Sequence, residues 1–190
     1  YSHFWHEMGK QYLGMDDIEG RVKGQTLVYI YDTFFPGMAK EQAEITERLN
    51  RFEQEMSFDF IPGVLDFIAD LHRNGVKTAV VTSSNEAKMA AVYRVHPEIK
   101  TLFDRILTAE MFTASKPAPD CFLLGMEVFG TTPDTTYVFE DSFNGIQSGK
   151  DAGMRVIGLS TTNPAESLRD KVYEVIPNFE KVTFEDYLRW

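Results

Sequence analysis

The spacing of apolar residues changes once along the chain, near residue 60. Before that point apolar residues recur three or four positions apart, which is the spacing of one face of an α-helix. This pattern predicts a helix at the start of the chain, another over residues 40–56, and between them a loop with the sequence GRVKGQT. We therefore expect a small helical domain, here called the helical segment, over residues 1–59.

From Ile61-Pro62-Gly63 onward, short and continuously apolar runs alternate with helical patterns. Pro62 is expected in the first turn of a helix that ends near Arg73, and Gly75 is expected to stop it. Apolar strands separated by helices are typical of a parallel sheet covered on both faces. We therefore predict an α/β, Rossmann-like core over residues 60–190. The predicted strands cover residues 77–82, 104–109, 136–140, 155–160 and 172–177, and the further helices cover 85–95, 119–129 and 143–152.

Charge and composition exclude several kinds of partner. The chain of 190 residues has a formal net charge of −10 and no basic stripe, so nucleic acid and anionic membranes are not expected partners. No apolar run is long enough to span a bilayer. Cys121 is the single cysteine, which excludes an intrachain disulfide and fits a cytoplasmic location. Because the chain starts with Tyr1 inside a helical pattern, we expect that an upstream segment has been removed.

Polar residues stand where the predicted strands end. Thr82 closes the run KTAVVT, Lys116 lies in the loop SKPAPD, and Glu140 and Asp141 end the run TYVFED. In open α/β sheets, ligands bind at the carboxyl ends of the strands. A hydroxyl, an ammonium and two carboxylates at one edge suit a phosphate together with a divalent cation.

Each of these residues also has a purely structural interpretation. Ser83 and Glu86 have the spacing of a capping box at a helix start. Lys116 resembles an ordinary solvated lysine, although the prolines after it stiffen its loop. Asp141 could serve only as the N-cap of the next helix.

The capping interpretation of Asp141 leaves Glu140 unexplained. Two adjacent carboxylates after an apolar run are costly unless they are paired or bound to a metal. Carboxylate oxygens suit Mg²⁺. Gly145 and Gly149 on the following helix would permit another group to approach the backbone closely.

The three motifs together resemble the haloacid dehalogenase superfamily, in its branch of β-phosphoglucomutase-like phosphatases and mutases. VVTSSN, SKPAPD and FEDSFNGIQSGKDAGM are similar to its second, third and fourth motifs and occur in the same order. The resemblance implies that Thr82 and Lys116 are catalytic, and that Glu140 and Asp141 bind Mg²⁺. It also implies substrate contacts from the residues after Thr82 and from a specificity loop in the helical segment, which would act as a cap. These substrate-binding candidates are Ser83, Ser84, Asn85, Lys23 and Gly24.

The first motif of that family, an Asp-x-Asp pair on the central strand, is missing from residues 1–190. Asp16 and Asp17 are adjacent rather than alternate, and they lie in a helical or loop context. By resemblance, the missing strand lies between the strand before Thr82 and the strand before Glu140. Its loss would leave two inner sheet edges unpaired, so we expect that this chain alone does not fold stably.

The function implied by the resemblance is a Mg²⁺-dependent phosphatase that acts on a small phosphorylated metabolite, such as a sugar phosphate, through an aspartyl-phosphate. The protein is expected to be a monomer or weak dimer. Two alternatives stay open: a phosphomutase, and a non-catalytic remnant that binds a phosphorylated ligand. A receiver domain is excluded, because its acidic pair precedes its Thr and Lys, whereas here the acids come last.

The specificity loop favours the phosphatase. Related mutases place an arginine three residues after the glycine that matches Gly24, and here that position holds Leu27. Arg21, Arg48 or Arg51 could replace that arginine, or all three could be solvated helical charges. A weaker alternative is that Lys23 forms a Schiff base, as in a phosphonate-cleaving relative.

Overall fold

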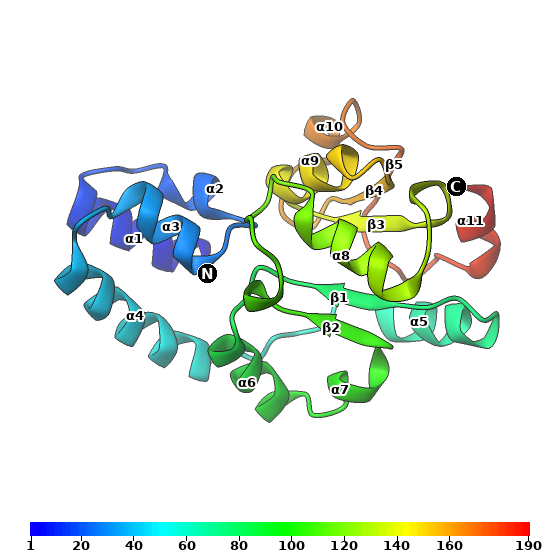
Figure 1. The fold of residues 1–190 in the computed structure, drawn as a ribbon, viewed down its shortest axis with the longest axis horizontal. Helices are drawn as coiled ribbons and strands as arrows, with labels where there is room; N and C mark the ends of the chain where they lie inside the picture. Colours follow the sequence, from blue (N-terminus) through cyan, green and yellow to red (C-terminus); the bar gives the residue numbers. More distant parts are fainter.

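The computed structural model describes all 190 residues (Figure 1). Four helices form the helical segment and pack around one apolar cluster, in which Trp5, Met8 and Ile45 have no exposed surface. Every buried member of this cluster comes from the four helices and the loops that join them. Figure 1 shows these helices as a group beside the sheets. They are α1 (Ser2–Leu13), α2 (Ile18–Val22), α3 (Leu27–Phe34) and α4 (Ala39–Gln54). The division into two domains near residue 59 stays a prediction.

The two middle helices of this segment were not predicted. Part of the expected loop lies in the helix α2, and the run LVYIYDTF, to which no separate element was assigned, forms α3. The start of α3 is fixed by Thr26, whose side-chain oxygen accepts a hydrogen bond from the backbone N–H of Tyr29 at 3.2 Å. Local propensity is a weak guide for such a short helix, because burial decides its conformation.

The rest of the chain has the predicted α/β fold. Five short strands alternate with helices, and every strand pair is parallel. The strands are β1 (Ala79–Val81), β2 (Arg105–Leu107), β3 (Tyr137–Glu140), β4 (Arg155–Leu159) and β5 (Glu174–Ile176). The helices are α5 (Val64–Arg73), α6 (Glu86–Val95), α7 (Ile99–Leu102), α8 (Asp120–Phe129), α9 (Phe143–Asp151), α10 (Ala165–Leu168) and α11 (Phe184–Arg189).

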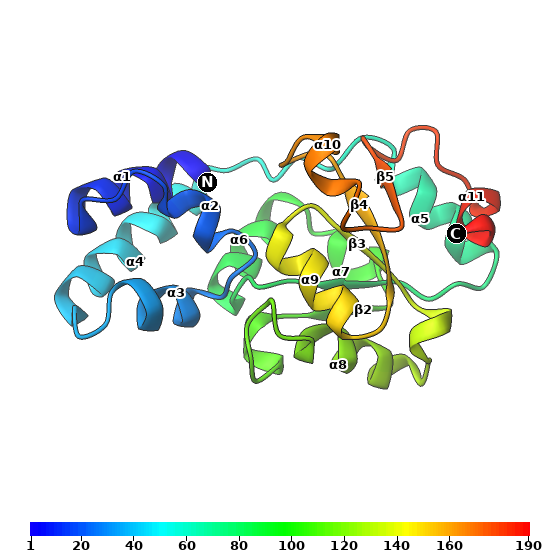
Figure 2. The same ribbon diagram turned by 90° about the horizontal axis from the view of Figure 1, so that it is seen from above.

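Helices cover both faces of the sheet that contains β4. Val156 packs in a cluster with residues of α8 and α9, whereas Ile157 and Leu159 pack in a second cluster with residues of α5. The side chains of β4 thus alternate between two apolar layers, as expected for a buried parallel strand. In Figure 2 the helical segment lies at one end of the molecule and α11 at the other.

The helix α5 begins two residues later than predicted. Gly63, with φ 80°, is its N-cap, and Pro62 precedes the cap instead of lying in the first turn. A Cβ at Gly63 would come within 2.3 Å of the backbone of Phe179 and Glu180, so this turn requires glycine. The predicted stop at Gly75 is confirmed, since α5 ends at its C-cap Asn74, directly before Gly75.

The strands form two sheets rather than one. The first contains β1 and β2, the second has the order β3-β4-β5, and β1 and β3 do not pair with each other. A groove of about 530 Å³ separates them, and its lining includes Val81 of β1 and Val138 of β3 together with Phe67 and Phe122. This interruption lies where the family resemblance places its central strand. No helix of the chain is both long enough and apolar enough to cross a membrane.

Candidate active site

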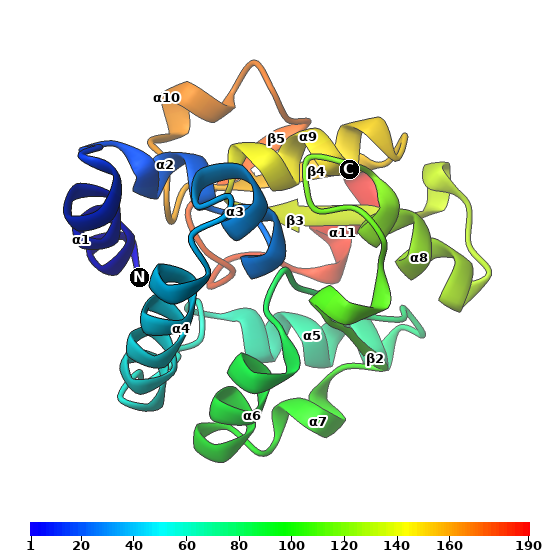
Figure 3. The ribbon, with the colours of Figure 1, turned by 60° about the vertical axis from the view of Figure 1, so that its left-hand side comes forward.

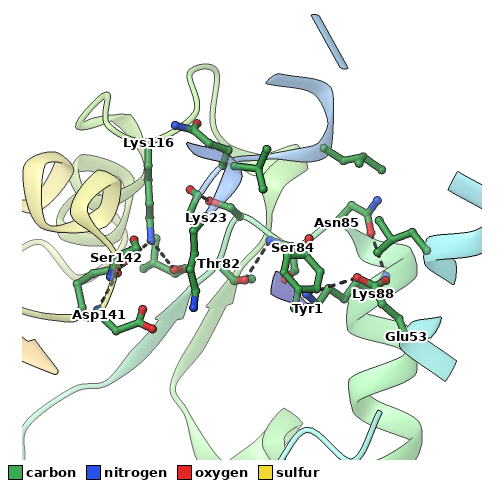
Figure 4. A pocket seen from close by; sticks show the side chains of 18 of the residues that line it. Tyr1, Lys23, Glu53, Thr82, Ser84, Asn85, Lys88, Lys116, Asp141 and Ser142 are labelled. Carbon is green, nitrogen blue, oxygen red and sulfur yellow. Dashed lines mark hydrogen bonds and ion pairs between the residues drawn. The ribbon is translucent and has the colours of Figure 1, made fainter. Parts of the chain in front are cut away.

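One cavity of about 280 Å³ lies between the helical segment and the carboxyl ends of β1 and β3 (Figure 4). All the residues predicted for the site line this cavity, although they come from four separate parts of the chain. They are Thr82, Ser83, Ser84, Asn85, Lys116, Glu140, Asp141, Lys23 and Gly24. The structure therefore brings the nine residues together, and their individual roles are proposals.

Thr82 stands directly after β1 with its hydroxyl oriented by the backbone. Its Oγ1 accepts a hydrogen bond from the N–H of Ser84 at 3.0 Å. A hydroxyl that accepts from an N–H keeps its own proton for another acceptor. Thr82 can therefore donate a hydrogen bond to a ligand oxygen in the cavity.

The residues after Thr82 do not form the predicted capping box. The N-cap of α6 is Asn85, whose Oδ1 accepts from the N–H of Lys88 at 2.9 Å. The Ser83 hydroxyl instead donates to the carbonyl of Gly24 at 2.7 Å and so connects β1 to the helical segment. The Glu86 carboxylate accepts from the hydroxyl of Thr108 at 2.7 Å. Tertiary contacts thus override the local spacing.

Lys116 is a buried lysine rather than a solvated one, with 3% of its surface exposed. Its Nζ pairs with Oε1 of Glu140 and lies 3.4 Å from the carbonyl oxygen of Val81. It also lies 4.8 Å from the ring centre of Phe122. An ammonium has three N–H donors, so two contacts hold this one in place and one donor is left for the cavity.

Glu140 is the anchor of Lys116. While Oε1 pairs with the ammonium, Oε2 accepts from the N–H of Asp141 at 3.1 Å, the N–H of Ser142 at 3.2 Å and the Ser142 hydroxyl at 3.1 Å. A Cβ on Gly145 would lie 2.0–2.3 Å from this carboxylate, so only glycine permits the approach. Both oxygens of Glu140 are thus bonded within the chain, and neither is free for a metal in this arrangement. The role of Glu140 as a metal ligand stays a prediction.

The close approach expected at Gly149 is also present. A Cβ there would lie 2.7 Å from Cγ2 of Val156 and 3.2 Å from Cγ1 of Val138. The two glycines thus let α9 pack directly onto the ends of β3 and β4. This packing fixes the start of α9 next to the cavity.

Asp141 is not the N-cap of α9. That position belongs to Ser142, whose Oγ accepts from the N–H of Gly145 at 3.0 Å. One carboxylate oxygen of Asp141, Oδ2, accepts from the hydroxyl of Thr162, and its carbonyl accepts from Nδ2 of Asn163 at 2.8 Å. The other carboxylate oxygen, Oδ1, makes no hydrogen bond within the chain and can bind a ligand.

The loop before α3 connects the helical segment to the site. Nζ of Lys23 donates a hydrogen bond to the hydroxyl of Thr162 at 2.9 Å. The backbone carbonyl of Lys23 accepts a hydrogen bond from Nδ2 of Asn144 at 2.8 Å. Gly24 has φ 78°, and a Cβ there would lie 2.6 Å from Oγ of Ser142. Glycine is therefore required at this position, both for its backbone conformation and for the close contact.

The three candidate arginines do not reach the cavity. The guanidinium of Arg21 lies 4.9 Å from the ring centre of Phe34, Arg48 donates to Gln11, and Arg51 pairs with Glu47. No arginine lines the cavity, whereas Leu27 does. Their interpretation as helical surface charges fits these contacts.

Sequence reasoning did not select several charged and polar residues of the cavity and its supports, among them Ser142, Thr162, Asn163, Glu53 and Lys88. Thr162 and Asn163 follow β4 at the same edge of the sheet, so the rule that selected Thr82 could have found them. Glu53 and Lys88 lie within amphipathic helices, where nothing in the sequence separates them from solvated charges.

The donor set of the site suits a hard cation more than a transition metal. The chain contains no cluster of three or more His, Cys, Asp or Glu side chains that could hold a metal ion, so a metal here would also need ligands from the substrate or from water. The free oxygen of Asp141 is a ligand of the kind that Mg²⁺ takes, because Mg²⁺ binds through one or two carboxylates together with phosphate oxygens and water. The residues present therefore fit Mg²⁺ bound jointly with a phosphate.

The family model of haloacid dehalogenase-like hydrolases matches residues 2–159. The chain belongs to the haloacid dehalogenase-like hydrolase family. Hexitol phosphatase A of Escherichia coli is 26% identical in an alignment of 190 positions that covers 94% of this chain and 83% of the relative. Protein CbbY of Cereibacter sphaeroides is 33% identical over 115 residues, or 59% of the chain and 50% of the relative. A β-phosphoglucomutase of Mycobacterium bovis is 30% identical over 68% of the chain and 49% of the relative.

Solved structures share the fold of this haloacid dehalogenase-like chain. A family IA hydrolase from Entamoeba histolytica superposes with a TM-score of 0.80 at 23% identity, over 99% of this chain and 90% of that one. A β-phosphoglucomutase from Clostridium difficile gives a TM-score of 0.77 at 21% identity, over 98% and 86%. The chain spans about half the length of several curated relatives, and 13% of Protein SUPPRESSOR OF QUENCHING 1 of Arabidopsis thaliana.

Proposed function

We propose that the intact protein is a Mg²⁺-dependent phosphatase that acts on a small phosphorylated metabolite of the sugar-phosphate kind. One observation carries the proposal: the Thr82 hydroxyl, the Lys116 ammonium and the Asp141 carboxylate line one cavity at the carboxyl ends of two parallel strands. Relatives support the substrate class, since Hexitol phosphatase A and Fructose-1-phosphate phosphatase YqaB are named for phosphorylated sugars or sugar alcohols.

The residues of the site have complementary roles in this proposal. The third donor of Lys116 and the hydroxyl proton of Thr82 hold the phosphoryl oxygens and stabilise the charge that develops on them during transfer. Glu140 keeps the ammonium of Lys116 in position. When bound at Asp141, Mg²⁺ would neutralise phosphate charge and orient the group.

In this proposal the attacking group is a carboxylate outside residues 1–190, because these residues contain no Asp-x-Asp pair. A carboxylate oxygen would attack phosphorus, the ester oxygen would leave with a proton, and water would then release inorganic phosphate from the aspartyl-phosphate. The groove between β1 and β3 opens beside Val81 and Glu140, which is where a strand with that carboxylate would deliver it. A strand placed in this groove would lie between β1 and β3, which have no other partner on that side, and would join the two sheets.

Two features favour hydrolysis over phosphomutase activity. No arginine lines the cavity, and Leu27 occupies the place where the related mutases put an arginine. A site without a second phosphate clamp releases its product instead of rebinding it for a second transfer. Binding without turnover is the second candidate, because residues 1–190 contain no Asp-x-Asp pair.

Phosphate release by the intact gene product tests the proposal. We expect Mg²⁺-dependent turnover of sugar phosphates that is abolished by a chelator. Asp141→Asn and Lys116→Met should each lower kcat by about 10²–10³-fold, the usual effect of removing one electrostatic group from such a site. Asp16→Asn, in an exposed loop, is the control. Equal rates for Asp141→Asn and the unaltered protein would remove Asp141 from the reaction, and binding without turnover would support the second candidate.

A further inference from the structure

A second pair of charged side chains lies in the cavity, apart from the phosphoryl end. Glu53 of α4 and Lys88 of α6 lie 3.4 Å apart between Oε1 and Nζ, with side-chain exposures of 5% and 19%. Figure 4 shows both next to Tyr1 at one end of the cavity, Lys116 and Asp141 at the other, and Thr82 and Ser84 between them. The ammonium of Lys88 lies 4.0 Å from the ring centre of Tyr1.

The pair joins the two parts of the molecule. The helices α4 and α6 lie side by side (Figure 3), one from the helical segment and one from the α/β core. A ligand at this end of the cavity is therefore contacted by the helical segment and by the core at the same time.

Stability does not explain why this pair is buried. Burial raises the pKa of the Glu53 carboxyl and lowers the pKa of the Lys88 ammonium, while the attraction between the two opposes both shifts. Replacing a buried ion pair by apolar residues is often neutral or stabilising. Beyond the ion pair, neither side chain makes a hydrogen bond within the chain, so each keeps capacity for a ligand.

We propose that Glu53 and Lys88 form a subsite for the neutral, hydroxyl-bearing end of the phosphorylated substrate. The carboxylate accepts a hydrogen bond from one hydroxyl and the ammonium donates one to its neighbour, a pattern that two adjacent hydroxyl groups satisfy. This inference rests on the proposed function and names the substrate class within it.

The charge of the subsite sets its selectivity. The pair has no net charge and no arginine lines the cavity, so a second phosphate would gain attraction from Lys88 but meet repulsion from Glu53. With a volume of about 280 Å³, the cavity is small and admits a small metabolite. A polyol or sugar with one phosphate fits both ends, whereas a bisphosphate does not.

Steady-state kinetics with three probes test the subsite in the intact protein. Acetyl phosphate has no hydroxyl group to offer Glu53 and Lys88, fructose 1-phosphate offers several, and fructose 1,6-bisphosphate offers a second phosphate. We expect fructose 1-phosphate to be preferred over the bisphosphate. In Glu53→Gln and Lys88→Met, the ratio of kcat/KM for fructose 1-phosphate to that for acetyl phosphate should fall about 10–100-fold, as for lost hydrogen bonds to charged groups.

Two further variants separate specificity from folding. Glu53→Lys should shift the preference toward the bisphosphate, a change that a folding defect would not produce. Glu47→Gln lies on the exposed side of the same helix, with its side chain 74% exposed, and should leave the ratio unchanged. If Glu53→Gln and Lys88→Met keep the ratio of the unaltered protein, the subsite is wrong while the proposed function stands.

A binding measurement covers the case in which the protein hydrolyses none of the probes. Calorimetric titration with fructose 1-phosphate should then still show weaker binding to Glu53→Gln than to the unaltered protein. Absence of turnover together with this difference would contradict the proposed function and support the subsite. Equal binding to both proteins, or none, would overturn the subsite.

Discussion

At the scale of single residues, the site depends on a glycine that lets Glu140 reach its partners. Gly145→Ala would place a methyl group 2.0–2.3 Å from the Glu140 carboxylate, which cannot move without releasing Lys116. We expect this substitution to lower the free energy of unfolding of the intact protein by about 1–3 kcal/mol, as overpacking does, and to reduce phosphatase activity. Urea unfolding and phosphate release measure the two effects.

The matched control is Gly20→Ala, because a Cβ at Gly20, within α2, meets nothing within 4 Å. That substitution should be neutral, or stabilise by up to about 1 kcal/mol because alanine favours a helix. An unchanged unfolding free energy in Gly145→Ala would show that Glu140 can occupy another position.

Sequence reasoning found the residues of the phosphoryl end but not their contacts. Thr82 and Asp141 could be selected because each follows an apolar run at a predictable edge of the sheet, and Lys116 because it lies in a proline-stiffened loop beside that edge. The caps could not be assigned correctly, because Ser83 and Asp141 each had a tertiary partner that a local pattern does not contain. The burial of Glu53 and Lys88 depends on how two distant helices pack.

At the scale of elements, His96 connects the end of α6 to the segment that follows α4. Its Nδ1 lies 3.1 Å from the Glu98 carboxylate, its Nε2 lies 3.0 Å from the carbonyl oxygen of Ser57, and its ring lies 4.7 Å from that of Phe60. The hydrogen bond to Glu98 raises the pKa of His96 above its ordinary 6.5. The raised pKa means that protonated His96 stabilises this connection below about pH 6.5, and that the contribution is lost as the pH rises through the pKa in the folded state.

An NMR titration of the imidazole protons measures this directly. We expect His96 to titrate above 6.5, and Glu98→Gln to lower its pKa because the carboxylate partner is removed. Titration of His96 below 6.5 in the folded protein would show that this connection is not made in solution.

How well each helix or strand could be predicted depended on its length and on the regularity of its apolar pattern. Long periodic helices such as α4 and the five apolar strands were found, and no strand end differs from its predicted position by more than two residues. The short helices α2 and α3 were missed, because five and eight residues give too little periodicity to recognise.

At the scale of the whole molecule, the two sheets leave β1 and β3 with one unpaired edge each. Exposed inner edges and an apolar groove favour association with other chains. We therefore expect residues 1–190, prepared alone, to unfold at a lower temperature than the intact gene product and to self-associate. Circular dichroism melts and size-exclusion chromatography measure both, and a cooperative, monomeric transition of the isolated chain would contradict this expectation.

The fold class was predictable from the alternation of strands and helices, and the interruption of the sheet followed from the missing first motif. The resemblance implied that the helical segment lies over the site, but the contacts that hold it at the sheet edge came only from the structure. The hydrogen bonds from Ser83 to Gly24 and from Asn144 to Lys23 join residues 59 and 121 positions apart, and no local pattern reports such contacts.

The central claim is that Thr82, Lys116 and Asp141 bind one phosphoryl group and one divalent cation together. Crystals of the intact protein soaked with phosphate and Mn²⁺, an anomalous scatterer in place of Mg²⁺, test it most directly. We expect an anomalous peak at Asp141 and phosphate density within hydrogen-bonding distance of Thr82 Oγ1 and Lys116 Nζ. Phosphate and metal bound away from these three side chains, or no binding at saturating concentrations, would contradict the claim.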